Sequence, residues 1–153
     1  MKIICIGLNY HDHIREFKGK VPEKPVFFLK ADSCLVVNNK PFFLPDFSNN
    51  IHYEVEVVMK ISKVGKNIET RFAHRYFDEL TLGIDFTARD IQNECREKSL
   101  PWEISKSFDH SAPIGKFIIK KGFEDLNNIN FHLDLNGKTM QKGNTSDMIF
   151  KFD

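Results

Sequence analysis

Short apolar runs, broken by Pro, Gly, Asn and Asp, recur along the chain and predict β-strands more often than helices. The clearest strand is residues 51–60, in which His52, Glu54 and Glu56 alternate with apolar or aromatic side chains. Its two-residue period places both glutamates on one face. Further short strands are predicted at residues 2–7, 27–29, 35–37, 42–44, 82–86, 114–119, 130–135 and 138–141.

Helical spacing is rarer. Apolar residues three and four apart predict a helix over residues 71–80. Thr87, with Asp90 three residues later, predicts an N-cap and a helix that Pro101 ends. Residues 8–20 are polar and predict a loop with one marginal helical turn. The balance predicts a mainly β chain with a few helices, in an α+β arrangement.

The organisation is that of one domain, residues 1–153, because no internal repeat, low-complexity tract or linker interrupts it. Asn136-Gly137 between two strands predicts a tight hairpin of type I′. The apolar run at residues 148–153 needs something to pack against. We therefore expect a domain that is C-terminally truncated and lacks strands that would follow.

Composition narrows the class of protein. Hydrophobic residues make up 41% and charged residues 28%, with a formal net charge of +1, so neither disorder nor nucleic acid or membrane partners are expected. Apolar runs are too short for a membrane span or a signal peptide. Cys5, Cys34 and Cys95 are widely spaced and form no CxxC pair, which favours reduced thiols and a cytoplasmic protein.

Three acidic side chains stand out. Glu54 and Glu56 lie about 7 Å apart on one strand face. They are either a solvated edge or a pair that shares a hard divalent cation such as Mg²⁺. Asp85 interrupts the otherwise apolar strand 82–86 and needs a partner there. Together the three carboxylates would form an open metal site.

Two further groups carry possible chemistry. Alternation over residues 102–109 places Lys106 between apolar neighbours on one strand face, which indicates either an ammonium aimed at an anion or a surface lysine. His13 and Glu16 are three residues apart and share a face if their loop turns helically. They form either a general base oriented by a carboxylate or part of a charged surface loop.

The chain resembles the fumarylacetoacetate hydrolase family, and most closely its small members of the acylpyruvate hydrolase and oxaloacetate decarboxylase type. Six short motifs in register carry the resemblance over nearly the whole chain. They are Gly7-Leu8-Asn9-Tyr10-His11-Asp12-His13, Phe28-Leu29-Lys30, His52-Tyr53-Glu54-Val55-Glu56, Asp85-Phe86-Thr87-Ala88-Arg89-Asp90-Ile91-Gln92, Leu100-Pro101-Trp102 with Ser105-Lys106-Ser107-Phe108-Asp109, and Gly143-Asn144-Thr145-Ser146-Asp147-Met148.

This resemblance implies a β-roll of mixed sheets, usually a homodimer, and a role for each candidate residue. The ligands of Mg²⁺ or Mn²⁺ would be the three carboxylates. Lys106 would face the substrate beside the metal, and Gln92 would contact the substrate. His13 and Glu16 would form a histidine–glutamate pair on a mobile lid. The residues so implied are Glu54, Glu56, Asp85, Lys106, Gln92, His13 and Glu16.

The activity that the resemblance implies is hydrolysis of a C–C bond in 2,4-dioxo acids (acylpyruvates), such as those of aromatic catabolism, with a pyruvate enolate held by the metal as it leaves. His13, oriented by Glu16, would deprotonate water, and Lys106 would stabilise the oxyanion. Oxaloacetate decarboxylation and hydration or isomerisation of 2-oxo-dienoates are alternatives within the family. An inactive, truncated remnant with a binding or structural role is the alternative of a different class.

Overall fold

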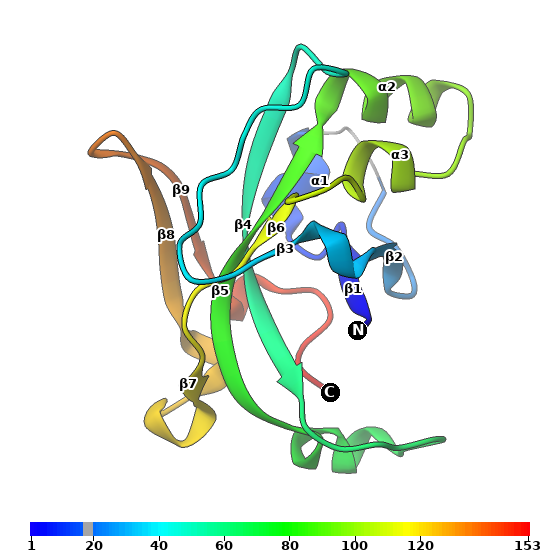
Figure 1. Ribbon diagram of the computed structural model, residues 1–153. Coiled ribbons are helices and arrows are strands. Elements are labelled where there is room, and N and C mark those ends of the chain that lie inside the picture. Colours follow the sequence, from blue (N-terminus) through cyan, green and yellow to red (C-terminus); the bar gives the residue numbers. More distant parts are fainter. Residues whose placement is uncertain (17–19) are drawn as a thin grey trace. The chain divides into compact units, whose positions relative to one another are not determined.

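The computed structural model describes residues 1–16 and 20–153, and the chain forms two compact units (Figure 1). The first unit, called the carboxylate unit below, comprises residues 1–5, 27–57 and 82–116. The second unit, called the hairpin unit, comprises residues 6–26, 58–81 and 117–153. The two long strands of the chain run through both units, and each unit is described separately.

Strands outnumber helices, as the sequence predicts. The strands are β1 (Ile3–Gly7), β2 (Val26–Lys30), β3 (Leu35–Val36), β4 (Ile51–Ile61), β5 (Phe77–Ala88), β6 (Ala112–Pro113), β7 (Ile118–Ile119), β8 (Asn130–Leu135) and β9 (Lys138–Asn144). The helices are α1 (His11–Glu16), α2 (Arg89–Glu97) and α3 (Glu103–Lys106), with 3₁₀ turns η1 (Asp32–Cys34), η2 (Thr70–Arg75), η3 (Lys120–Gly122), η4 (Leu126–Asn128) and η5 (Thr145–Asp147).

Within the described residues, these strands form four small sheets. β4, β5 and β7 form one in that order, while β1 pairs with β2, β3 with β6, and β8 with β9. β3 and β6 are parallel, with Leu35 opposite Ala112, whereas β5 and β7 are antiparallel, with Glu79 opposite Ile119. The sequence pattern predicts many short strands, and their mixed pairing is what the family resemblance implies.

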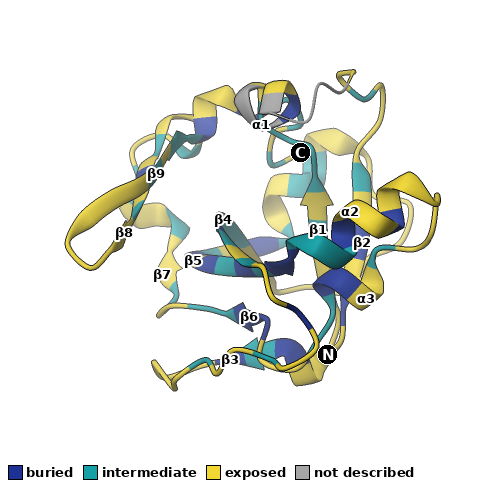
Figure 2. Ribbon diagram, turned by 90° about the horizontal axis from the view of Figure 1, so that it is seen from above, coloured by how far each residue is buried: buried dark blue, intermediate teal, exposed yellow. Residues whose placement is uncertain are grey.

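The carboxylate unit buries both apolar and polar side chains. Its apolar core includes Phe28, Cys34, Val36, Ala88 and Cys95, and the buried residues are drawn dark blue in Figure 2. Equally buried are polar side chains, which require partners in that environment. They are Lys30, Ser48, Glu54, Asp85, Thr87, Gln92, Ser105, Lys106 and Ser111.

The hairpin unit is organised around β8 and β9. Asn136 and Gly137 have φ values of 52° and 78°, as the predicted type I′ turn requires. A Cβ added at Gly143 would come within 2.5 Å of the Phe131 ring, so glycine leaves room for the ring against β9. The Tyr10 ring meets the same Phe131 edge-on, with ring centroids 6.2 Å apart.

The helix predicted over residues 71–80 is wrong beyond its first turn. The chain forms η2 up to Arg75 and then enters β5 at Phe77. Strand pairing decides the outcome, because Leu80 lies opposite Ile118 on β7 and Lys120 Nζ donates to Phe77 O at 2.5 Å. The spacing of apolar residues along the sequence does not reveal such distant partners.

The predicted N-cap at Thr87 is also wrong. Thr87 is a residue of β5, and Ala88, which precedes α2, makes no side-chain cap. Asp90 instead accepts hydrogen bonds from Ser48 Oγ at 2.6 Å and Asn49 N at 3.0 Å. It thereby ties the start of α2 to the segment before β4.

Residues 42–44 form no strand within the described chain, because Pro41 and Pro45 flank them and supply no N–H to a ladder. The Phe42 ring stacks on Phe86 instead, with centroids 3.9 Å apart. The strand predicted over residues 114–119 is likewise confined to β7.

The apolar run at residues 148–153 has contacts inside the hairpin unit. The Phe152 ring lies 6.1 Å from that of Phe77. Phe150 N donates to Asn9 Oδ1 at 2.7 Å, and Asn9 Nδ2 donates to Phe150 O at 3.0 Å. The expectation that further strands follow residue 153 stays a prediction.

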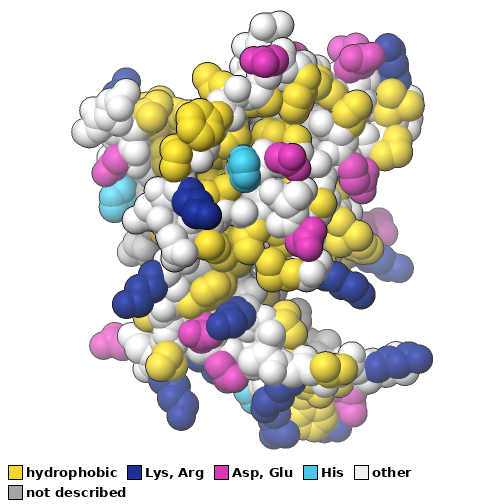
Figure 3. Space-filling model, viewed as in Figure 1, with side chains coloured by type: hydrophobic (Ala, Val, Ile, Leu, Met, Phe, Trp, Pro, Cys, Tyr) yellow, Lys and Arg dark blue, Asp and Glu magenta, His cyan; other side chains and the backbone are white. Residues whose placement is uncertain are grey.

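Helices of the described residues include none long and apolar enough to cross a membrane. All three cysteines lie in the described part of the chain and are free thiols. On the face shown in Figure 3, Lys and Arg side chains lie among Asp and Glu side chains.

Candidate active site

Alternation on β5 builds a polar, buried strand face. Gly83, Asp85 and Thr87 point to the buried side, whereas Leu82 on the opposite face is 39% exposed. On β4, Glu54 is also buried, with 9% of its surface exposed. The interpretation of the glutamate face as a solvated edge is therefore wrong for Glu54.

Lys106 joins these strands. Its Nζ donates to Glu54 Oε2 at 2.9 Å, to Asp85 Oδ2 at 2.6 Å and to Thr87 Oγ1 at 2.6 Å. An ammonium has three N–H bonds, so all of them are used. The Lys106 ammonium also lies 5.3 Å above the Phe28 ring, which favours its charge.

The element that carries Lys106 differs from the prediction. Residues 103–106 form the short helix α3, not a strand, and Ile104 is 66% exposed while Lys106 is 3% exposed. The turn is closed by Lys106 N, which donates to Trp102 O at 3.1 Å. The Trp102 ring packs edge-on against Phe28 at 6.1 Å, and this contact anchors the start of α3. The predicted anion contact of Lys106 is correct although its element is not.

A second buried lysine, Lys30, stands beside the first. Its side chain is 1% exposed, and its Nζ lies 2.8 Å from Asp85 Oδ1. It donates to Ser111 Oγ at 3.0 Å and to Ser111 O at 3.1 Å, and it also bonds to Lys106 O. Asp85 therefore lies between two lysine ammonium groups.

Arg89, in the first turn of α2, completes the cluster. Its Nη2 lies 2.5 Å from Glu54 Oε1, and its Nη1 donates to Gln92 Oε1 at 2.5 Å. Gln92 is three residues further along α2 and is buried, so one guanidinium links a predicted metal ligand to a predicted substrate contact.

The charges of Glu54 and Asp85 act on the third carboxylate, Glu56. Burial raises the pKa of Glu56 to about 8, and the negative charges of Asp85 and Glu54 add to this effect. Burial opposes the charge of Lys106, but Asp85 and Glu54 outweigh it, so the pKa of the ammonium is raised. Glu54, Glu56 and Asp85 thus form one electrostatic cluster around Lys106.

The donor set suits a hard cation, since carboxylate oxygens are the ligands that Mg²⁺ and Mn²⁺ prefer. Asp85 Oδ1 is buried and receives no hydrogen bond from any described residue, even though the Lys30 ammonium is close. Such an atom has a lone pair to offer a metal. Among the side chains that the structure describes, however, no group of three His, Cys, Asp or Glu residues is arranged to hold a metal ion. Lys106 stands between Glu54 and Asp85, so a cation would replace part of that positive charge.

The predicted base and its partner belong to the other unit. His13 and Glu16 fall within α1, which confirms a helical turn there, and Ile14 anchors it with 3% exposure. The side chains of both predicted residues lie outside the described part of the structure. Their hydrogen bond, and the mobility of the lid that the resemblance implies, stay predictions.

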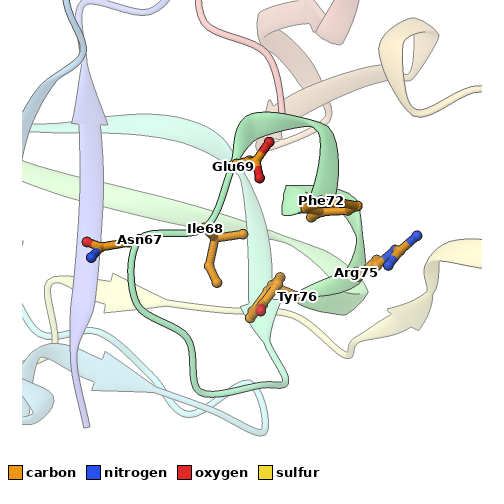
Figure 4. Close-up of a pocket in the computed structure, with 6 residues that line it drawn as sticks. All are labelled: Asn67, Ile68, Glu69, Phe72, Arg75 and Tyr76. Atoms are coloured by element: carbon orange, nitrogen blue, oxygen red, sulfur yellow. The ribbon is translucent and has the colours of Figure 1, made fainter.

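A pocket of about 260 Å³ lies in the hairpin unit (Figure 4). None of the predicted site residues lines it. The lining residues are Asn67, Ile68, Glu69, Phe72, Arg75 and Tyr76.

Sequence reasoning missed Lys30 and Arg89 as members of the cluster. The pattern of β2 held a signal for the first, because Lys30 shares a strand face with the buried Phe28. For Arg89 the i, i+3 spacing to Gln92 was visible, but its partner Glu54 is 35 residues away in the sequence.

Comparison with known proteins decides the family. The family model described as fumarylacetoacetate (FAA) hydrolase C-terminal matches residues 2–153. The chain belongs to the fumarylacetoacetate hydrolase family. The predicted family is thereby confirmed.

Curated relatives in this family include enzymes of oxaloacetate chemistry. Mitochondrial oxaloacetate decarboxylase of Dictyostelium discoideum is 41% identical over 150 residues, which cover 97% of this chain and 69% of the relative. Mitochondrial oxaloacetate tautomerase FAHD1 of Homo sapiens is 37% identical over 148 residues, which cover 97% of this chain and 67% of the relative.

Solved structures confirm the mainly β fold. A fumarylacetoacetate hydrolase family protein from Yersinia pestis CO92 matches with a TM-score of 0.93 and 33% identity, covering 98% of this chain and 69% of that one. Fumarylpyruvate hydrolase from Pseudomonas aeruginosa, solved in complex with Mn²⁺ and pyruvate, matches with a TM-score of 0.90 and 31% identity, covering 99% of this chain and 67% of that one.

Proposed function

We propose that the chain forms the active site of a divalent-metal-dependent enzyme that hydrolyses a C–C bond in 2,4-dioxo acids. The observation that carries the proposal is the buried cluster of Glu54 and Asp85 around the Lys106 ammonium, with Glu56 beside it. Buried carboxylates held by a buried ammonium are a costly arrangement, and such sites are commonly functional.

Glu54, Glu56 and Asp85 would hold Mg²⁺ or Mn²⁺. When bound, such a cation supplies Lewis-acid stabilisation of negative charge that develops on the 2-oxo group of the substrate. The solved relative that contains Mn²⁺ and pyruvate supports both the metal and the 2-oxo acid class.

The hydrolytic step uses the chain's own groups. His13, oriented by Glu16, accepts a proton from water as the hydroxyl adds to the 4-oxo carbon. The bond between C3 and C4 then breaks, its electron pair goes to C3, and a proton returns there to give pyruvate and a carboxylic acid. Lys106 stabilises the oxyanion that forms on the attacked carbon.

Lys106 can do this only by giving up a present partner. All three of its N–H bonds go to Glu54, Asp85 and Thr87. Exchange of one of these acceptors for a substrate oxygen is therefore part of the proposal. Gln92, buried beside Arg89, would contact the substrate from α2.

Oxaloacetate decarboxylation is the second candidate function, and the relative named oxaloacetate decarboxylase, which is 41% identical, favours it. Loss of CO₂ requires the same stabilised enolate but no hydrolytic water. Hydration or isomerisation of 2-oxo-dienoates shares that requirement. A homodimeric, cytoplasmic protein that acts in aromatic catabolism remains our expectation for the whole enzyme.

Steady-state assays of the purified chain with acetylpyruvate, fumarylpyruvate and oxaloacetate, each with Mg²⁺ and with Mn²⁺, test the proposal. His13→Ala should abolish hydrolysis of the first two compounds and spare decarboxylation of oxaloacetate. Lys60→Met, an exposed lysine of the hairpin unit, is the matched control and should change neither. No turnover of any of the three compounds would contradict the enzyme proposal and favour an inactive remnant.

A further inference from the structure

Lys30 has an environment that surface or packing roles do not explain. Its Nζ is surrounded by one carboxylate oxygen and four neutral oxygens, although an ammonium has three N–H bonds to donate. These oxygens are Asp85 Oδ1, Phe86 O, Lys106 O, Ser111 O and Ser111 Oγ.

The hydrogen bonds and the charge of Lys30 are directed at different partners. The bonds go to carbonyl and hydroxyl oxygens of Phe86, Lys106 and Ser111. Asp85 Oδ1 receives no hydrogen bond from the described residues despite its 2.8 Å separation from Nζ. Lys30 therefore holds the carboxylate by charge and leaves a lone pair of Oδ1 available.

Lys30 also holds the end of α3. It bonds to the carbonyl oxygen of Lys106, and Ser111 Oγ donates to the same oxygen at 2.9 Å. The side chain of Lys106 begins at that residue and ends on Asp85 Oδ2. One buried ammonium thus fixes both ends of the Lys106–Asp85 ion pair.

We infer that Lys30 is a positioning residue, which sets the place of Asp85 and of Lys106 so that Asp85 Oδ1 is free to ligate a cation. The inference rests on the proposed function of this site. With a side chain 1% exposed, Lys30 acts through these two residues and not by touching substrate.

Lys30→Met, which keeps the length of the side chain and removes its charge, provides the test. Loss of a nearby positive charge alone would tighten binding of a cation by the carboxylates. Loss of positioning would weaken it by about 10- to 100-fold, the usual effect of a residue that supports a metal ligand. The sign of the change in Mn²⁺ affinity, measured by calorimetry on the full chain, therefore separates the two roles.

A second measurement follows Lys106 directly. The ¹⁵N-labelled ammonium group of Lys106 should give a protected NMR resonance, assigned by its absence in Lys106→Met. We expect Lys30→Met to shift or broaden this resonance. Lys120→Met is the matched control, because Lys120 also bonds to carbonyls, of His74 and Phe77, but belongs to the hairpin unit. It should lower thermal stability and leave both the resonance and the Mn²⁺ affinity unchanged.

Ser111→Ala keeps the test decisive if Lys30→Met does not fold. It removes one acceptor of Lys30 and the hydroxyl that supports Lys106 O. We expect the same direction of change, with Mn²⁺ affinity lowered by about two- to tenfold. Unchanged or tighter Mn²⁺ binding together with an unchanged Lys106 resonance, in whichever variant folds, would overturn the inference.

The outcomes for Lys30 and for the proposed function are separable. If the wild-type chain binds no Mn²⁺, the metal-dependent function fails, and the Lys106 resonance alone decides whether Lys30 positions that residue. If the wild-type chain binds Mn²⁺ and turns over substrate but Lys30→Met leaves both readouts unchanged, only the inference about Lys30 fails.

Discussion

The two halves of β5 use the same chemistry in different surroundings. In the hairpin unit, Glu79 lies 2.6 Å from Lys60, and these side chains are 33% and 54% exposed. In the carboxylate unit, Asp85 lies 2.6 Å from Lys106, and these side chains are 8% and 3% exposed. The distances are equal, so burial is what distinguishes the pairs.

Burial changes what each pair can do. Water screens the first pair, which contributes about 0–1 kcal/mol to stability. The second pair has lost its water, so its groups depend on one another, and removal of one partner leaves an uncompensated charge. A strand that places carboxylates in such a site gives up stability, and the compensation we propose is metal binding and catalysis.

The largest difference between the two halves of β5 is expected when a candidate metal ligand is removed. Asp85→Asn should lower Mn²⁺ affinity by at least about 100-fold, because even residues that only support a ligand contribute about 10- to 100-fold. Asp78→Asn changes an exposed aspartate in the first half of β5 and should leave Mn²⁺ affinity unchanged. Calorimetric titration of both variants measures the difference. Equal Mn²⁺ affinities of the two variants would show that Asp85 is not a ligand of the metal.

Removing a cation from each pair tests the stability difference. Lys106→Met should lower the free energy of unfolding of the metal-free chain by about 3–5 kcal/mol, because Glu54 and Asp85 lose a shared partner. Lys60→Met should lower it by less than about 1 kcal/mol. Urea unfolding of the two variants gives both numbers, and similar values would show that burial does not govern these pairs.

A pH dependence that Glu56 causes should mark the carboxylate unit. The folded chain raises the pKa of Glu56 from 4.5 to about 8, so the protonated acid is favoured in the metal-free fold. The stability that this gives is complete below pH 4.5 and is lost as pH rises through about 8. Glu56→Gln should remove this loss in urea unfolding curves recorded between those limits, while Glu79→Gln should retain it. Mn²⁺ affinity of the wild-type chain should rise over the same interval as Glu56 ionises.

The smallest effect belongs to the exposed pair. Glu79→Gln should change the free energy of unfolding by less than about 1 kcal/mol, and added salt should reduce the difference further. A large effect that persists in high salt would mean that the Lys60–Glu79 pair is not solvated as its exposure indicates.

Much of the carboxylate unit could be predicted from local pattern. Two-residue alternation identified β4 and thereby Glu54, and an apolar run interrupted by a single acidic residue identified the second half of β5 and thereby Asp85. The prediction was wrong where a distant partner decides the structure. The first half of β5 has helical spacing, but its pairing with Ile118 and Ile119 makes it a strand.

The cluster itself shows the same limit. Lys106 was found through the apolar character of its neighbours, yet it is held by α3 and by residues 21 and 52 positions away. Lys30 was overlooked because the acceptors of its hydrogen bonds lie 56 to 81 positions away in the chain. Local spacing identifies a buried charge, whereas only the fold identifies what neutralises it.

The central claim is that Glu54, Glu56 and Asp85 converge on one divalent cation. The most direct measurement is a crystal structure of the chain grown with Mn²⁺, with the metal located by its anomalous scattering. The account predicts one peak about 2.1 Å from a carboxylate oxygen of each of the three residues, with Lys106 displaced from between Glu54 and Asp85. A Lys106 ammonium that still bridges Glu54 and Asp85, with no peak beside them, would contradict it.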